Sequence, residues 1–288
     1  MSQQLIDSIN TNGFGIISSF LNEHEILLME QAYNDTLVTV ERETKTINPK
    51  RLWNLFVNEH ILDYALPSEG SILNEVLLCI LGKNYLLAGS YSNTIYPGRK
   101  EGQIHQDYPF NVLATIESTC TSSSSSSSSS SFSESTVNQE NNRPLNYEIT
   151  TLLALDDFTE LNGGTWIIPK SHKYPLGTKV SAETFNKKAI QILAKKGDLI
   201  IMHGAAFHRS GGNVTAEKRT AILAMYLQQS QRPQVDPWIS LPEKSKQKLG
   251  KRSRKMLGAH WHKFDEEQKN KRLKHESRSS SRKVLNIN

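Results

Sequence analysis

The chain contains little cysteine and no long apolar run. Of its 288 residues, only Cys79 and Cys120 are cysteines, which argues against a disulfide framework and favours a reducing compartment. Cys79 lies in the apolar run ILNEVLLCIL and is predicted to be a buried small hydrophobic residue. No stretch approaches the roughly eighteen uninterrupted apolar residues that span a bilayer, so we expect no membrane partner.

The two ends of the sequence lack common targeting signals. The segment MSQQLIDSINTNGFG has neither the basic start nor the apolar run of a secretory signal. The last residues read VLNIN rather than Ser-Lys-Leu, the common peroxisomal signal. We therefore expect a cytoplasmic protein. A nuclear location is an alternative, because the basic runs near the C-terminus resemble nuclear localisation signals.

The formal net charge of +5 is concentrated toward the C-terminal end of the sequence. Residues 231–268 are predicted to pack on the body as short helices, and residues 269–288 to form a basic, disordered tail. A basic tail can attract nucleic acid, but no aromatic stacking platform accompanies this one. A nucleic-acid partner is therefore not expected, although a nucleic-acid-associated protein is kept as an alternative function.

Residues 1–84 are predicted to form an N-terminal helical segment that packs on the core. Within it, residues 1–12 are expected to be a short entry segment, and Phe14–Ile17 is strand-like. Ser18 or Ser19 is expected to cap a helix that follows, because apolar residues then recur at helical spacing.

A second helix is predicted in LPSEGSILNEVLLCILG, with Ser68 as its N-cap and Gly82 as its stop. From Tyr85 onward the pattern changes to short β-branched or aromatic runs between clusters of Pro, Gly and Asn. The runs are LLAGSYSNTIYPG, EITTLLALDDF, GTWIIPKS, AIQILAKKGDLIIMH and RTAILAMYLQ. Such a series is typical of a sandwich or barrel, here spanning residues 85–230.

Residues 119–142 interrupt this strand series. They include ten consecutive serines, Ser122–Ser131, with Asn, Gln and Glu around them. This composition cannot bury enough apolar area to offset the entropy of ordering, so we predict a disordered insert within one fold. A linker between two domains is the weaker interpretation, because candidate metal ligands lie on both sides.

Two separated segments carry those candidate ligands. His105 and Asp107, in GQIHQDYPF, lie two residues apart, so on a strand they point to the same face. His208 follows a strongly apolar strand. Two imidazoles and one carboxylate are the ligand set of a non-haem Fe(II) oxygenase. Arg219, eleven residues after His208, could bind the far carboxylate of 2-oxoglutarate.

Each of these assignments has an alternative. The first histidine and the aspartate could be an ordinary hydrogen-bonded pair at a strand end. His203 competes with His208 for the third ligand position, and His208 is favoured because only its spacing to Arg219 matches the pattern described next. Arg219 could also be a surface residue. His172 is expected on a turn rather than at the metal.

Several segments, in order, resemble the phytanoyl-CoA dioxygenase family of Fe(II)/2-oxoglutarate-dependent oxygenases, from about Gly13 to about Leu257. The segments are SYSNTIYPGRKEGQIHQDYPF, LLALDDFTELNGGTWIIPKSHK, KKGDLIIMHGAAFHRSGGNVTAEKRTAI and ISLPEKSKQKLGKRSRKMLG. The resemblance implies a double-stranded β-helix (jelly-roll, cupin-like) core, a mainly β fold with flanking helices.

The resemblance also implies roles for particular side chains. Four match its functional positions: the iron ligands His105, Asp107 and His208, and the 2-oxoglutarate anchor Arg219. Ser210 would assist at the same carboxylate, and Gln103 would contact the co-substrate or the substrate. Trp166 would line the substrate pocket, with a place in the core as an equal alternative.

The function implied by the resemblance is that of a dioxygenase using Fe(II), 2-oxoglutarate and O2. It would hydroxylate an aliphatic carbon of a small-molecule substrate and decarboxylate 2-oxoglutarate to succinate. Asp107 stands where related halogenases have alanine or glycine, which favours hydroxylation. A non-catalytic jelly-roll binding protein is the alternative. We expect a monomer or a weak homodimer, with pocket walls around Arg51–Phe56 and Tyr91–Tyr96; the sequence leaves the substrate undefined.

Overall fold

The computed structural model describes residues 2–108, 146–175, 177–233 and 235–262. The predicted insert at residues 119–142, the predicted tail at residues 269–288 and Cys120 lie outside the described residues. The described part of the chain contains no helix that is both long enough and apolar enough to cross a membrane.

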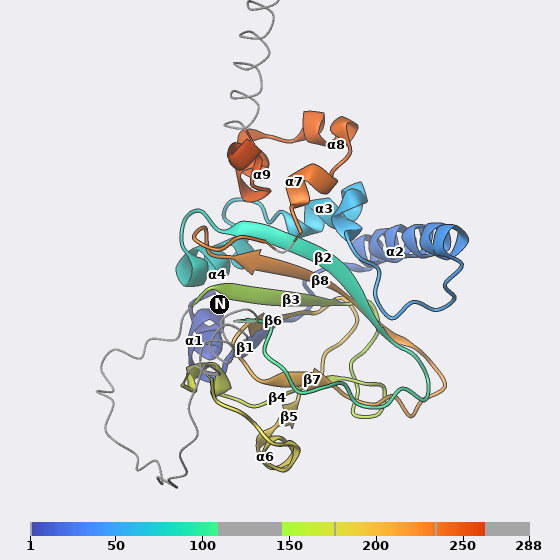
Figure 1. The fold of residues 1–288 in the computed structure, drawn as a ribbon, viewed down its shortest axis with the longest axis vertical. Coiled ribbons are helices and arrows are strands. Elements are labelled where there is room, and N and C mark those ends of the chain that lie inside the picture. The colour runs from blue at the N-terminus through green and yellow to red at the C-terminus, as the bar shows by residue number, and fades with distance from the viewer. Residues whose placement is uncertain (1, 109–145, 176, 234, 263–288) are drawn as a thin grey trace, which may run out of the picture.

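Two antiparallel sheets form the core (Figure 1). The larger has the order β1-β6-β3-β8-β2, and the smaller the order β5-β4-β7. The strands are β1 Phe14–Ile17, β2 Leu86–Ile95, β3 Glu148–Ala154, β4 Thr165–Ile167, β5 Ile190–Gln191, β6 Leu199–His203, β7 His208–Ser210 and β8 Arg219–Leu227. This is the jelly-roll core predicted from the sequence. Helical residues nevertheless outnumber strand residues, so "mainly β" understates the helices.

The large sheet is covered on both faces, which explains why β3 is buried along its whole length. Successive side chains of a strand point to opposite faces. Ile149 and Leu153 accordingly pack into the cluster on the helical side, whereas Leu152 and Ala154 pack toward the small sheet. A strand covered on both faces does not alternate between apolar and polar residues, and EITTLLAL shows no such alternation: it is apolar apart from Glu148 and the adjacent pair Thr150 and Thr151.

Helices form the outer layer of the large sheet. They are α1 Ser2–Asn12, α2 Glu23–Thr44, α3 Glu59–Ala65 and α4 Ile72–Leu81, with the short 3-10 helix η1 at Leu55–Val57. Helix α1 therefore occupies most of the stretch predicted to be a simple entry segment. Its buried residues Leu5, Ile6 and Ile9 recur at helical spacing and join the same apolar cluster as β3.

The predicted strand Phe14–Ile17 is confirmed, but the predicted cap of the next helix is wrong. Ser19 adopts a left-handed backbone with φ 49°, and α2 begins later. Asn22 caps it: its side chain accepts the Glu25 backbone N–H at 3.0 Å, and the Glu25 carboxylate accepts the Asn22 N–H at 2.8 Å. This reciprocal capping box satisfies two backbone donors, which a single serine does not.

Helix α4 differs from its prediction in two details. Its N-cap is Ser71 rather than Ser68, and its stop at Gly82, with φ 90°, is as predicted. Cys79 is exposed, not buried. The helical repeat places Leu77 and Ile80 in the core and turns Cys79 toward solvent, a distinction that an almost continuous apolar run conceals.

Three short helices follow the last strand, namely α7 Pro237–Ser240, α8 Glu243–Lys248 and α9 Lys251–Met256. They lie at the end of the molecule opposite the small sheet and α6, Ala182–Lys188 (Figure 1). Arg252 joins α9 to the body: its guanidinium donates to the Pro67 carbonyl and the Asn74 Oδ1, both at 2.6 Å, and to the Tyr85 hydroxyl at 3.0 Å.

These three hydrogen bonds predict the effect of an Arg252→Met substitution. Methionine keeps an apolar stem of similar length but removes every donor, so the free energy of unfolding should fall by about 1–3 kcal/mol. Chemical denaturation measures the change. Lys251→Met, at an exposed neighbouring position of α9, is the matched control and should stay within about 0.5 kcal/mol. Equal effects of both substitutions would show that Arg252 does not anchor the helix.

Candidate metal centre

A backbone pairing brings the two distant sequence segments together. The His105 N–H donates to the His208 carbonyl at 3.0 Å, and the His208 N–H donates to the His105 carbonyl at 2.9 Å. The chain after β2 thus runs beside β7 as an additional edge segment. Gly102 lies so close to β7 that a Cβ there would fall 2.6 Å from the Ser210 Oγ. Glycine at this position permits the close approach of the backbones.

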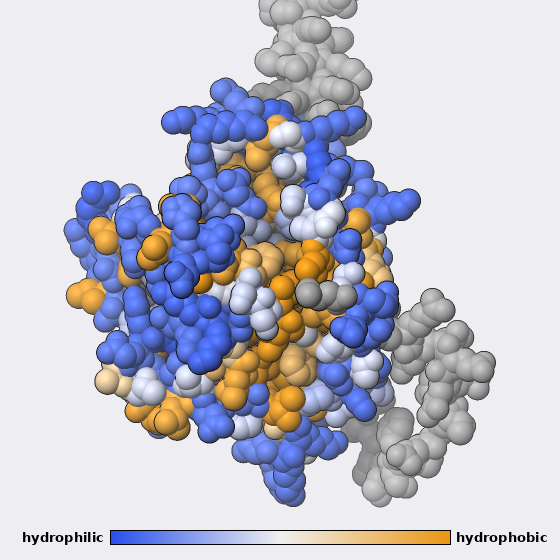
Figure 2. All heavy atoms as spheres, turned by 180° about the vertical axis from the view of Figure 1, so that it is seen from behind, coloured by the Kyte–Doolittle hydropathy of each residue, from blue (hydrophilic) through white to orange (hydrophobic). Residues whose placement is uncertain are grey.

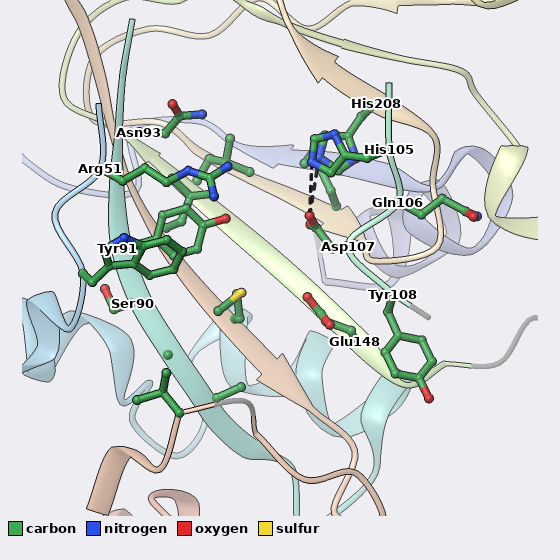
Figure 3. A pocket seen from close by; sticks show the side chains of 18 of the residues that line it. Arg51, Ser90, Tyr91, Asn93, His105, Gln106, Asp107, Tyr108, Glu148 and His208 are labelled. Carbon is green, nitrogen blue, oxygen red and sulfur yellow. Dashed lines mark ion pairs between the residues drawn. The ribbon is translucent and has the colours of Figure 1, made fainter. Parts of the chain in front are cut away.

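This pairing places three potential ligands around one point. His105, Asp107 and His208 each offer an atom, and the three atoms lie within 4.8 Å of one another. The Asp107 Oδ1 is 3.6 Å from the His105 Nε2 and 3.7 Å from the His208 Nε2. Figure 3 shows both imidazoles directed at the carboxylate. Two imidazole nitrogens and a carboxylate oxygen on one side of a cavity suit a divalent metal ion with open positions.

Outer hydrogen bonds fix these side chains in orientations suited to metal binding. The Nδ1 of His105 donates to the Gln103 carbonyl at 2.9 Å, and the Nδ1 of His208 donates to the Ala206 carbonyl at 3.0 Å. These bonds leave both Nε2 atoms facing the carboxylate, as the nitrogens available to bind a metal ion. Burial, followed by the neighbouring His208, lowers the pKa of His105, which also keeps that ring neutral.

A second carboxyl group lies beside the first. The Thr150 hydroxyl is 2.8 Å from the Asp107 Oδ2, to which it donates, and 3.3 Å from the Glu148 Oε1. Burial, followed by the charge of Asp107, raises the pKa of Glu148. Glu148 lines the same cavity, but it was not predicted from the sequence to be a site residue. The only signal in the sequence was a charged residue at the start of a strand that has no other charged residue.

The competing histidine, His203, has both ring nitrogens engaged elsewhere. Its Nε2 donates to the Asn146 Oδ1 at 3.0 Å, and its Nδ1 accepts the Ala205 N–H at 3.1 Å. Its ring packs 4.9 Å from that of His172, and burial lowers its pKa to about 3. His172 lies in the 3-10 turn η3, Ser171–Lys173, as expected. The structure therefore groups His208, not His203, with the other two candidates.

Arg219 is fully buried at the start of β8. One of its nitrogens donates to the Gly163 carbonyl, and the guanidinium lies 4.2 Å from the centre of the Phe158 ring. Its Nε and Nη1 have no hydrogen-bond partner among the described residues. Burial lowers the pKa of Arg219 to about 9, which still leaves it charged near neutral pH. A buried guanidinium with two unpaired donors fits an anion, such as the far carboxylate of 2-oxoglutarate.

The strand period connects this arginine to the cavity. Arg219 shares a face of β8 with Leu223 and Met225, which both line a cavity of about 700 Å³. That volume is typical of small-molecule sites. The cavity also contains all three candidate metal ligands. Arg219 itself is not among the residues that line the cavity, but its charge is one of those that lower the pKa of Lys50, which does line it.

The three secondary candidates have different places. Gln103 and Ser210 line the cavity together with the metal ligands. Trp166 is absent from the described wall of this cavity and packs against the apolar cluster of Ile168 and Phe207. Trp166 is half-buried there, and its role at the substrate pocket stays a prediction.

Hydrophobic residues also reach the surface of the molecule. Figure 2, the face opposite to that of Figure 1, shows a hydrophobic band down the middle between hydrophilic margins. Trp53 and Val235, two residues of the cavity wall, are 57% and 42% exposed. The cavity therefore has an apolar rim through which a partly hydrophobic compound could enter.

Known proteins resemble the chain in both sequence and fold. Residues 10–221 match the model of the family "Phytanoyl-CoA dioxygenase (PhyH)". A multifunctional dioxygenase, prhA of Penicillium brasilianum, is 30% identical over 115 residues. That match covers 38% of this chain and 38% of the relative, well under two thirds of the relative's length.

Two solved structures share the fold. AviO1 from Streptomyces viridochromogenes matches with a TM-score of 0.59 and 16% identity, over 81% of this chain and 97% of its own. EctD from S. alaskensis, solved with 2-oxoglutarate and 5-hydroxyectoine, matches with a TM-score of 0.59 and 15% identity, over 81% of this chain and 78% of its own. These likenesses confirm the jelly-roll fold. Together with the family match over most of the chain, they show that this protein belongs to the phytanoyl-CoA dioxygenase family.

Proposed function

We propose that this protein is an Fe(II)/2-oxoglutarate-dependent dioxygenase that hydroxylates an aliphatic carbon of a small molecule. The observation that carries the proposal is the convergence of His105, Asp107 and His208 within 4.8 Å, in one cavity. Family membership and the buried, half-unpaired Arg219 support it. When bound, Fe(II) would supply oxygen activation coupled to the decarboxylation of 2-oxoglutarate to succinate.

The side chains of the chain would hold and orient the reactants. His105 and His208 would bind the ion through their Nε2 atoms, because their Nδ1 atoms already donate to backbone carbonyls. Asp107 would bind through Oδ1, because its Oδ2 accepts from Thr150. Arg219 would hold the far carboxylate of 2-oxoglutarate and so fix its reactive end toward the ligands.

The remaining cavity would position the substrate and exclude water. Leu152, Met202 and Leu223 line it with apolar groups close to the metal ligands. An aliphatic carbon packed against them would lie near the site of oxidation. Limiting water there protects a reactive oxidant from side reactions.

A prediction about the metal ligands concerns Asp107→Ala. Loss of the only anionic ligand should weaken Fe(II) binding by at least about 100-fold, exceeding the roughly 10–100-fold effect of removing outer-shell partners. Release of succinate from 2-oxoglutarate should stop. Anaerobic calorimetry and a succinate assay measure the two effects. Asp63→Ala, at an exposed site on α3, is the control; unchanged binding and turnover in Asp107→Ala would refute the proposal.

A prediction about the co-substrate anchor concerns Arg219→Met. Removing a buried charge offsets the loss of the hydrogen bond to Gly163, so without 2-oxoglutarate the free energy of unfolding should fall by no more than about 1 kcal/mol. Affinity for 2-oxoglutarate should fall by about 100-fold or more, because two charge-assisted hydrogen bonds are lost.

Thermal unfolding with and without 2-oxoglutarate separates the two effects, because a ligand stabilises only the fold that binds it. The native protein should gain stability from 2-oxoglutarate, and Arg219→Met should not. Arg42→Met, at an exposed position of α2, should behave like the native protein. If Arg219→Met keeps the full gain, the carboxylate is held elsewhere.

A further inference from the structure

The wall of the cavity opposite the metal ligands is built by a short segment beside β2. The Ser92 N–H donates to the Leu52 carbonyl, and the Thr94 N–H donates to the Lys50 carbonyl, both at 2.9 Å. Trp53 pairs with Tyr91 in the same register. The segment therefore extends the large sheet at its edge. The two-residue period turns Leu52 into the core and directs its two neighbours to the cavity.

One of these neighbours, Arg51, is held by aromatic rings. Its guanidinium carbon lies 5.5 Å from the centre of the Trp53 ring and 5.1 Å from that of Tyr91. The two rings are themselves 4.9 Å apart and inclined by 36°. Planar guanidinium groups stack on such faces and keep their hydrogen-bond donors free at the edge. The rings thus fix the position of Arg51 without using its donors.

Among the residues that the structure describes, the charge of Arg51 has no partner of opposite sign. No ion pair or side-chain hydrogen bond within the described residues involves it. Figure 3 shows its side chain reaching into the cavity from the wall across from His105 and His208. A fixed cation with free donors, at the side of a cavity, is suited to bind a carboxylate or a phosphate.

The charges of the cavity are distributed unevenly. Arg51, Lys50 and Arg232 line it, whereas its two carboxyl groups, Asp107 and Glu148, are both joined to Thr150 at the metal end. Partial burial and the neighbouring arginines, Arg51 first, lower the pKa of Lys50, which reflects the crowding of cations here. An anion that enters the cavity is therefore attracted to the wall that holds Arg51.

The floor between the two ends is apolar with a few unsatisfied polar atoms. Its apolar side chains are Leu152, Leu223, Met225 and Leu227. The Ser90 Oγ and the Asn93 Oδ1 also belong to the lining residues, and both atoms are buried without a partner among the described residues. Buried polar atoms are normally paired, so these two favour a ligand that has polar groups near Arg51.

We propose that the substrate is an amphipathic anion whose carboxylate or phosphate binds Arg51 and whose apolar body lies on this floor, reaching toward the metal ligands. This proposal rests on the proposed dioxygenase function, because the bound anion is a substrate only if the protein is that enzyme. It assigns Arg51 as the residue that selects anionic over neutral compounds and sets which carbon faces the site of oxidation.

Binding of chain-matched probes tests this selection without relying on turnover. Decanoate, decyl phosphate and decanol share an apolar chain and differ in the charged group. Calorimetry would measure their affinities for the full chain loaded with Fe(II) and saturating 2-oxoglutarate, without oxygen. The native protein should bind one or both anions at least about tenfold more tightly than decanol, as expected for a charge-assisted contact.

Substitution then locates the preference. Arg51→Gln should abolish the tenfold preference and leave the affinity for decanol unchanged, whereas Arg42→Gln, which removes the same charge from the exposed face of α2, should retain it. Decanoate or decyl phosphate as the tighter ligand identifies the anionic group. Equal binding of anions and decanol, no saturable binding of any probe, a preference that survives Arg51→Gln, or one lost equally in Arg42→Gln would each overturn the proposal.

Repeating the titrations without Fe(II) and 2-oxoglutarate separates this proposal from the dioxygenase function. If the chain fails to bind metal or 2-oxoglutarate yet Arg51 still selects anions, the dioxygenase function fails and the anion site stands. If metal and 2-oxoglutarate bind normally and the anion preference is absent, the reverse holds.

Discussion

The paired backbone hydrogen bonds between His105 and His208 are the constraint on which the site depends. They join two positions that lie 103 residues apart in the sequence, on either side of the serine-rich segment. A β-bridge fixes the separation of the two Cα atoms to a few tenths of an ångström, and the extended backbone then brings Asp107 to the same side. The serine-rich segment can therefore differ in length without altering the ligand geometry, provided that the bridge forms.

Burial of Arg219 lowers the stability of the fold in exchange for a candidate anion-binding site. A fully buried guanidinium, two of whose nitrogens have no partner among the described residues, destabilises the unliganded protein, because removing a charge from water is only partly compensated by the Gly163 carbonyl and the Phe158 ring. An anionic ligand bound to Arg219 would recover this desolvation cost. Ligand binding and folding stability are thus linked through one side chain, and the ring of Phe158 keeps the guanidinium rigid in the meantime.

Local sequence patterns predicted most of the core strands and the candidate metal ligands, but not the start of α2, the exposure of Cys79 or the role of Glu148. The strands of the core and the stop at Gly82 follow from apolar runs and glycine, whose physical effects are local. The start of α2 was wrongly predicted, because the sequence does not show whether a serine caps a helix or lies in a left-handed turn before it. Cys79 was wrongly predicted to be buried, because an apolar run does not show which face of a helix is exposed to solvent. Glu148 had to be missed, because its role comes from β3 lying beside the Asp107 segment, a tertiary contact that no local pattern encodes.

Charge balance links the two ends of the cavity. A divalent ion at the metal ligands, the charge of Asp107, a dianionic 2-oxoglutarate and the charge of Arg219 together cancel. In the unloaded cavity, burial and the neighbouring charge of Asp107 raise the pKa of Glu148. The charges left uncompensated on the wall are those of Arg51 and its cationic neighbours. These four charges would therefore balance at the metal end of a loaded site, whereas the wall that holds Arg51 would stay positive. An incoming anion would be oriented by that difference before it makes any contact.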